Sequence, residues 1–418
     1  MIYNYKTLML LNTIRNTYLL NAENDDCLHY ITENYGIQLY RENNNTIFQC
    51  KKDNFEKYLK KYTNINHNDI CSINKFLTSS SNEKGICKQK LISINKSIKE
   101  KIEKTINVKI HMQLALEEME IKKFIHNSLR QYNIKDNYYI FTYSISKYNR
   151  MLISDFVVFK SIEDIDINKI SNMIFDEIIW SLSKKSQLNS SKNFDIILKN
   201  TAAGIFFHEC IGHFLEADHY YNSPIRLLED NKLCSKNITI IENLECDYKI
   251  DDYGSEIYKN IQLIKDGCIK NVLSNEVYSN LLEIKNTGNG ITENSYMYPF
   301  IRMRNMKLLG KSNNIEDLIS NTDRGILIEK ISLGEVNVYT GDFSILVTKS
   351  YIINNGIIKD ALDEFVLSYN IRQFREVDME VCNDMESRMS LCGKFGAIVK
   401  VNYCTPSVCI KWGKKVGV

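Results

Sequence analysis

The polar stretch from Ser183 to Asn193 divides the chain into two parts of different character. Before it, apolar residues recur at both helical and strand spacing. After it, one helical pattern is followed by short strand-like runs that turn residues separate. We therefore expect an α+β protein with a mixed α/β N-terminal domain at residues 1–188. A β-rich C-terminal domain with an antiparallel, barrel-like sheet should follow at residues 189–418.

Two sets of apolar residues in the first part recur every three or four positions, which predicts two amphipathic helices. They are Leu91, Ile94, Ile98 and Ile102, and Ile167, Ile170, Ile174 and Ile178. Alternating residues at 108–114 and the apolar runs Tyr138–Tyr143 and Phe156–Phe159 predict strands. The Asn-rich stretch at 42–45 is typical of a loop.

Two short motifs in the second part predict tight hairpins. Lys265-Asp266-Gly267 and Asn354-Asn355-Gly356 each lie between apolar runs, and such sequences favour two-residue turns. The run Phe194–Leu198 predicts a strand, and Thr201 is a candidate cap for the helix that follows it.

Charge and composition exclude several classes of protein. Lysine and arginine number 53 against 51 acidic residues, so no net charge favours nucleic acid or a membrane surface. The apolar run Thr7–Leu11 is too short to span a bilayer and lacks the flanks of a signal peptide. The 12 cysteines are scattered without the spacing of a disulfide framework. We expect a cytoplasmic protein with reduced thiols that binds neither nucleic acid nor membrane.

Residues 206–218 read FFHECIGHFLEAD and contain the densest group of chemically active side chains. Common zinc peptidases carry His-Glu-x-x-His, whose four-residue spacing puts both imidazoles on one face of a helix. Here His208 and His213 are five positions apart, which rotates the second ring by about 140° on an ideal helix. Gly212 would permit a bulge or a helix end that turns His213 back toward His208.

Two imidazoles do not complete a metal site, because catalytic zinc keeps three protein ligands and one open position. The nearest candidates in sequence are Glu216, Asp218 and His219, and the distant ones are the cysteines. Spacing alone does not choose among them. It also leaves open a core helix with a packed imidazole, which the surrounding phenylalanines would suit.

The segment Thr201–Asp218 resembles the signature segment of the TldD/PmbA family of metalloproteases. Five later segments resemble further blocks of that family, in the same order along the chain. They are Ile250–Gly254, Thr287–Gly290, Pro299–Asn305, Gly334–Phe343 and Leu391–Lys394. The resemblance covers residues 195–410, whereas the N-terminal half matches only in its mixed α/β character.

The resemblance implies a metal site and an activity. Cys392 matches the family's metal-binding cysteine, so His208, His213 and Cys392 would hold Zn²⁺ and Glu209 would act as the general base. Arg302 and His219 are candidates for stabilising the oxyanion, with structural roles as the alternative.

The expected activity is hydrolysis of small peptides or unfolded protein segments, bound along an exposed strand edge. The implied assembly is a heterodimer with a TldE-like paralogue or a homodimer. The alternative function is a non-catalytic partner subunit, although such a chain would be expected to have lost the histidines or the glutamate.

Overall fold

The computed structural model describes most of the chain. The described residues are 7–21, 27–40, 46–50, 54, 57–58, 60, 67–78, 84–105, 111–127, 131–148, 150–188, 194–228, 230–243, 249–293 and 297–411. The predicted loop at 42–45, the first residues of the strand predicted at 108–114 and the end of the 183–193 stretch lie outside these ranges.

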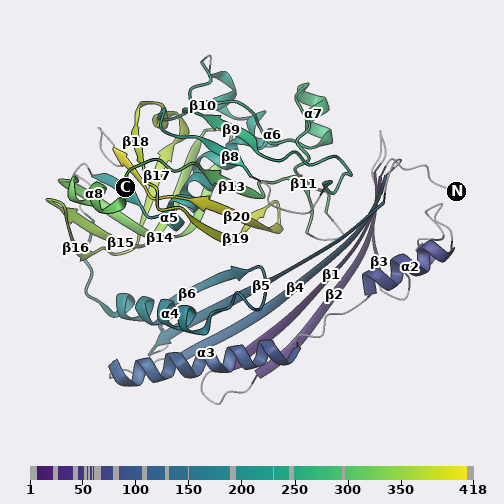
Figure 1. Cartoon of the computed structure of the whole chain (residues 1–418), viewed down its shortest axis with the longest axis horizontal. Helices are drawn as coiled ribbons and strands as arrows, with labels where there is room; N and C mark the ends of the chain where they lie inside the picture. The colour runs from purple at the N-terminus through teal and green to yellow at the C-terminus, as the bar shows by residue number, and fades with distance from the viewer. Residues whose placement is uncertain are drawn as a thin grey trace.

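A six-stranded antiparallel sheet fills the first part of the chain, in the order β3-β2-β1-β4-β5-β6. Its strands are β1 Thr7–Asn21, β2 Cys27–Tyr40, β3 Thr46–Cys50, β4 His111–Asn127, β5 Gln131–Lys147 and β6 Arg150–Phe159. Figure 1 shows that the longest of these strands curve together as one arc. The strands predicted at 138–143 and 156–159 are confirmed as parts of β5 and β6.

Both predicted amphipathic helices are confirmed, as α3 Lys84–Thr105 and α4 Ile167–Leu182. Their apolar faces share one buried cluster with Leu114 and Phe141 of the sheet. The Asp166 side chain caps α4 by accepting from the backbone N–H groups of its first turn. A shorter helix, α2 His67–Thr78, packs on another part of the sheet. No helix in the described ranges is long and apolar enough to cross a lipid bilayer.

Two larger sheets and a short hairpin make up the second part of the chain. One sheet has the order β16-β15-β14-β7-β21-β18, with β17 also pairing with β15. Its strands are β7 Asp195–Leu198, β14 Arg324–Asn337, β15 Asp342–Asn354, β16 Ile357–Ala361, β17 Phe365–Asn370, β18 Asp378–Val381 and β21 Val408–Lys411.

The other sheet has the order β10-β9-β8-β13-β20-β19. Its strands are β8 Ile240–Glu242, β9 Ile261–Lys265, β10 Cys268–Ile269, β13 Asn305–Leu308, β19 Glu386–Lys394 and β20 Ala397–Thr405, and the hairpin is β11 Gly290–Ile291 with β12 Phe300–Ile301. Only the β7–β14 and β13–β20 pairs are parallel among the described strands. The predicted α+β class with a β-rich second part is confirmed.

Three hairpins of this part close with two residues in the left-handed region, the geometry of a type I′ turn. Two of them are the predicted turns, Asp266–Gly267 between β9 and β10 and Asn355–Gly356 between β15 and β16. The third, Phe395–Gly396 between β19 and β20, has φ angles of 51° and 80°. Phenylalanine is unusual at such a position, since its Cβ makes the left-handed region unfavourable.

The helix that begins the opening motif, α5 Asn200–Phe207, packs between the two larger sheets. A Cβ added to Gly204 would lie 2.7 Å from the Tyr403 ring of β20, whereas Phe206 stacks edge-on against Phe343 of β15. The predicted Thr201 cap is wrong. The helix starts at Asn200, whose N–H donates to the Ser407 hydroxyl oxygen at 3.1 Å, so a residue distant in sequence takes the capping role.

Ion pairs connect the N-terminal sheet to the second part of the chain. Lys123 pairs with Asp252 at 2.5 Å, and Lys400 pairs with Asp136 at 2.7 Å. Leu391 of β19 also packs against the cluster around Tyr138. The division of the chain between residues 188 and 189 stays a prediction.

Candidate metal centre

A π-helical turn, η1 His208–Gly212, follows α5 and resolves the five-residue spacing of the histidines. The N–H of His213 donates to the carbonyl of His208, an i to i+5 hydrogen bond that widens the turn by one residue. The two imidazoles consequently face the same way, with ring centroids 4.7 Å apart. A short 3-10 helix, η2 His213–Leu215, continues the chain, so the motif does not form a regular α-helix.

Gly212 permits this turn to lie close to the neighbouring chain. A Cβ at this position would overlap the side chain of Met303, which leads into β13. The glycine is therefore required for close packing, and the bulge that it was expected to allow is present as η1.

Strand β19 brings Cys392 to the two histidines. Its Sγ lies 3.3 Å from Nε2 of His213, and the ligand atoms of His208, His213 and Cys392 all lie within 4.8 Å of one another. The three residues are between 3 % and 7 % exposed. Neither ring nitrogen of His208 makes a hydrogen bond with a described residue. A buried imidazole without partners is rare in a packed core, so the cluster has room for a ligand.

The charges of the cluster also suit a cation. Burial raises the pKa of Cys392, but the imidazoles of His213 and His208 outweigh it and hold that pKa well below its usual value. Burial lowers the pKa of His213, but Cys392 and Glu216 outweigh it and hold that pKa well above its usual value, so a metal that binds this ring displaces a proton from it. A thiolate is the form of cysteine that binds metals, and two imidazoles with one thiolate leave a fourth position open on zinc.

Glu209 lies beside the cluster, with Oε2 3.6 Å from Nε2 of His213. Burial raises its pKa above the ordinary value, against the lowering influence of His213 and His208. Strand β14 passes so close that a Cβ at Gly334 would overlap Cγ of Glu209. Gly334 thus limits where the Glu209 side chain can lie.

Glu216, a candidate ligand from the sequence, lies on the opposite side of His213. Its Oε2 is 3.1 Å from Nδ1 of His213 and accepts from Lys394 Nζ at 2.8 Å, while Oε1 accepts from the N–H of Met303. The side chain is fully buried, yet Lys394 and His213 outweigh that burial and hold its pKa well below its usual value. Such a carboxylate fixes the orientation of an imidazole and does not need to touch the metal.

Lys394 is a residue of the candidate site that the sequence reasoning missed. It lies two positions after Cys392 on β19 and therefore on the same face of the strand. Besides Glu216 it pairs with Asp218, at 2.7 Å. Its place in the Leu391–Lys394 block was the available signal. His213, Glu216 and His219 form a second group of close ligand atoms, but Lys394 occupies its carboxylate.

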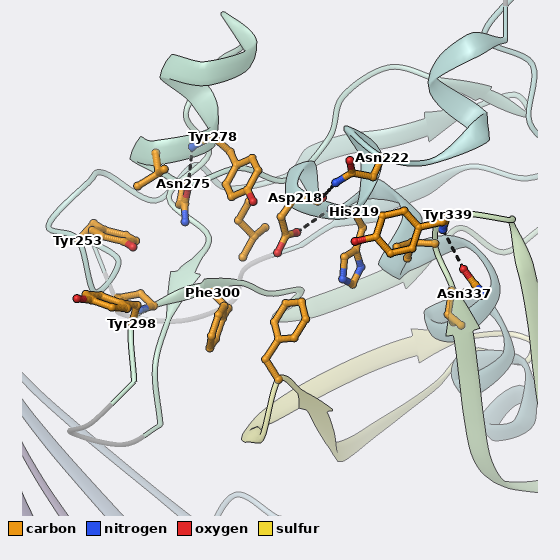
Figure 2. A pocket seen from close by; sticks show the side chains of 16 residues that line it. Asp218, His219, Asn222, Tyr253, Asn275, Tyr278, Tyr298, Phe300, Asn337 and Tyr339 are labelled. Atoms are coloured by element: carbon orange, nitrogen blue, oxygen red, sulfur yellow. Dashed lines mark hydrogen bonds between the residues drawn. The ribbon is translucent and has the colours of Figure 1, made fainter. Parts of the chain in front are cut away.

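The two oxyanion candidates differ in position. Arg302 is 1 % exposed and donates to the main-chain carbonyls of Cys392 and Ala397, so it braces the β19–β20 hairpin. His219, from α6 Ala217–Tyr220, lines a cavity of about 940 Å³ next to the cluster. Figure 2 shows this cavity, with Asp218 beside His219.

Comparison with known proteins places this fold and motif in a family. Residues 191–413 match the family model described as the PmbA/TldA metallopeptidase C-terminal domain. The chain belongs to the PmbA/TldD family. Curated relatives from bacteria and archaea are similar to this member over part of its length.

The metalloprotease TldD homolog of Buchnera aphidicola subsp. Acyrthosiphon pisum is 30 % identical over 240 residues, 55 % of this chain and 49 % of the relative. The zinc metalloprotease TldD homolog of Saccharolobus solfataricus is 26 % identical over 253 residues, 59 % of this chain and 56 % of the relative. This PmbA/TldD family member thus spans about half the length of the curated relatives it matches.

Two solved structures share the fold of this family member over nearly its whole length. TldE from Thermococcus kodakarensis has a TM-score of 0.69 at 15 % identity and covers 99 % of this chain and 96 % of its own. A putative modulator of a DNA gyrase from Thermotoga maritima has a TM-score of 0.69 at 19 % identity, with 97 % and 94 % covered. The N-terminal sheet is therefore part of the shared fold.

Proposed function

We propose that this chain is a zinc-dependent metallopeptidase that hydrolyses peptide bonds in small peptides or unfolded protein segments. The convergence of His208, His213 and Cys392 beside Glu209 is the observation that carries the proposal. The names of the relatives, metalloprotease and zinc metalloprotease, support it at the level of the family.

His208, His213 and Cys392 would hold the Zn²⁺ ion. When bound, a divalent zinc ion supplies Lewis acidity that lowers the pKa of water and polarises the scissile carbonyl. Glu209 takes a proton from the attacking water as the new carbon–oxygen bond forms. It then delivers that proton to the amine nitrogen as the carbon–nitrogen bond breaks. Glu216 holds His213 in the orientation that this site requires.

Strand β14 offers a course for an extended substrate. In the described part of the chain, its pairing with β7 ends at Ile328, whereas its pairing with β15 continues to Asn337. The later half of β14 therefore has one edge that β7 does not cover, and Glu209 packs at Gly334 in that half. A peptide that pairs with this edge through its backbone would pass the general base, and backbone pairing favours broad sequence specificity.

The assembly is also part of the proposal. A protein with the same fold carries the name TldE, so we infer a heterodimer with a TldE-like paralogue, or a homodimer of this chain. Measurement of the molar mass of the purified chain, with and without such a paralogue, distinguishes the two. The cytoplasmic location stays a prediction.

A Glu209→Gln variant tests the chemistry. We expect it to keep its zinc. We expect its rate of hydrolysis of an unstructured peptide to fall at least about a hundredfold, because the attacking water has no base. Glu335→Gln is the matched control, since it removes an exposed carboxylate from β14 next to Gly334. Undiminished turnover in Glu209→Gln would refute its role. A zinc-loaded wild-type chain that cleaves no peptide, with or without a paralogue, would favour the non-catalytic subunit.

A further inference from the structure

The cavity next to the candidate metal centre is lined in part by two residues that contact the surroundings of that site. Asp218 and His219 of α6 line one side, and Nδ1 of His219 lies 3.1 Å from the carbonyl oxygen of His213. The end of β14 and the first residues of the turn after it, residues 336–339, line another side. The cavity therefore lies beside the candidate metal centre.

Besides three asparagines and five aliphatic residues, the lining contains six aromatic side chains (Figure 2). They are Tyr253, Tyr278, Tyr298, Phe300, Tyr339 and Phe395. Among the described lining residues, Asp218 and His219 are those that can carry a charge near neutral pH, and Asp218 already pairs with Lys394 at 2.7 Å. The cavity offers aromatic faces and no unpaired charge, which suits an aromatic or large apolar group.

Two of these rings are exposed to solvent to an unusual degree. Tyr339 is 72 % exposed and Phe395 is 63 % exposed. An apolar group that covers them would remove aromatic surface from water, which is favourable. Exposed apolar surface around a hollow is typical of a ligand-binding groove.

The backbone at Phe395 is a second, independent observation. Its φ of 51° lies in the left-handed region, as do the Asp266 and Asn355 positions of the other two hairpins. Aspartate and asparagine are preferred there, whereas phenylalanine is disfavoured. Strained positions of this kind cluster at functional sites. The centroid of the Phe395 ring lies 5.2 Å from that of Phe300, which also lines the cavity. The unfavourable backbone conformation of Phe395 therefore places its ring in the cavity lining.

The distance to the cleaved bond follows from β14. Gly334 contacts Glu209, and Val336 of the cavity wall lies two residues further along the strand. A strand rises about 3.3 Å per residue, so the wall begins roughly 7 Å along β14 from the residue that lies against the general base. A peptide alongside β14 has the same rise, and its side chain about two positions from the scissile bond would reach the cavity.

We propose that this cavity is a side-chain subsite that gives the peptidase a preference for substrates with an aromatic or large apolar residue within about three positions of the cleaved bond. The inference rests on the proposed peptidase function and names a substrate preference for that same site. The occupant is the side chain of the substrate, since ring contacts lead from Phe395 of the lining through His219 to His213 of the candidate metal centre.

A set of unstructured peptides that differ at one position tests the preference. That residue is phenylalanine, leucine, alanine or aspartate, and it is moved one step at a time along the peptide. We expect kcat/KM for phenylalanine to exceed that for alanine about tenfold at one position, with aspartate lowest. Equal kcat/KM for all four residues at every position would overturn the inference and leave the proposed function intact.

Two variants connect the preference to the cavity. Tyr339→Ala and Phe395→Asn should bring the phenylalanine-to-alanine ratio close to one while cleavage of the alanine peptide persists. Phe395→Asn should also raise the Tm, because asparagine tolerates the left-handed backbone. Tyr148→Asn is the matched control: Tyr148 is also left-handed and 81 % exposed, but it lies in the β5–β6 turn and does not line the cavity. A Phe395→Asn protein with a lower Tm and an unchanged phenylalanine-to-alanine ratio would show that the Phe395 ring stabilises the fold and does not set the preference.

A binding measurement separates this inference from the proposed function. The zinc-loaded Glu209→Gln protein should bind the phenylalanine peptide about tenfold more tightly than the alanine peptide, whether or not the wild-type chain cleaves either. Equal affinities would overturn the subsite. Absence of cleavage by the wild-type chain, with unequal affinities, would overturn the peptidase function alone.

Discussion

The two ring nitrogens of His213 face regions of opposite character. On the Nδ1 side, Glu216 has partners for both oxygens, from His213, Lys394 and the N–H of Met303. On the Nε2 side lie Cys392 at 3.3 Å and the ring of His208, whose two nitrogens have no hydrogen-bond partner among the described residues. Both regions are buried.

The difference shows that the two nitrogens of one imidazole have different surroundings: protein groups hold Nδ1, whereas Nε2 faces the candidate ligands. Buried polar groups are nearly always paired, because an unpaired one costs free energy. The Nδ1 side obeys this rule with protein groups alone, as expected of a support that orients the ring. On the Nε2 side, the ring nitrogens of His208 have no hydrogen-bond partner among the described residues, as expected where a cation is to be bound. The two sides should therefore respond differently to mutation and to zinc.

Loss of the sulfur is the change with the largest expected effect. Cys392→Ala should reduce bound zinc from about one ion per chain to a small fraction, because a three-ligand site loses its only anionic ligand. Cys210→Ala is the matched control, a buried thiol within the same π-turn that does not belong to the cluster. Metal analysis of both purified proteins is the measurement. Equal zinc in Cys392→Ala and the wild type would remove Cys392 from the coordination sphere.

Loss of the Glu216 carboxylate should come next, with an effect that does not depend on zinc. Glu216→Ala leaves Lys394, whose side chain is 4 % exposed, with Asp218 as its remaining carboxylate. Breaking such a buried pair costs about 3 kcal/mol of the free energy of unfolding. Urea unfolding of the zinc-free proteins measures it, and Glu216→Gln, which keeps an acceptor for His213, should lose less. If the free energy of unfolding changed only in the zinc-loaded proteins, the Nδ1 side would not be a support that acts independently of zinc.

An added methyl group on β14 should have the smallest effect on stability and act mainly on catalysis. Gly334→Ala would push Glu209 away from its position, at a cost of about 1–3 kcal/mol of the free energy of unfolding. A displaced general base should lower kcat/KM up to about a hundredfold while zinc stays bound. Gly393→Ala is the control, because a Cβ there meets nothing within 4 Å. Equal kcat/KM in the two variants would show that Glu209 tolerates displacement.

Local sequence patterns predicted local structure well. The Asp-Gly and Asn-Gly turns and the helices α3 and α4 depend on residues only a few positions apart, which a sequence displays directly. The Thr201 cap was wrong because Ser407, more than two hundred positions later, takes that role. Helix ends are sensitive to such tertiary contacts.

The candidate site was only partly accessible to the same reasoning. Gly212 indicated an irregular turn, but neither the i to i+5 hydrogen bond nor the close packing against Met303 can be read from neighbouring residues alone. Cys392 came from the family resemblance, because 179 positions of separation carry no information about distance. To predict that Lys394 pairs with the buried Glu216, one would need the register of β19, which no local pattern provides.

The wide turn between the histidines bears on how such a chain can be related to zinc peptidases of the commoner spacing. No substitution alters the number of residues between His208 and His213, so the two spacings are separated by a gained or lost codon. Deletion of Cys210 alone would leave the sequence His-Glu-Ile-Gly-His. It would also rotate everything downstream by about 100° about the helix axis and carry Glu216 away from Lys394. A change of one residue in length therefore removes all the supporting contacts of Glu216 at once, with no half-way sequence between the two spacings.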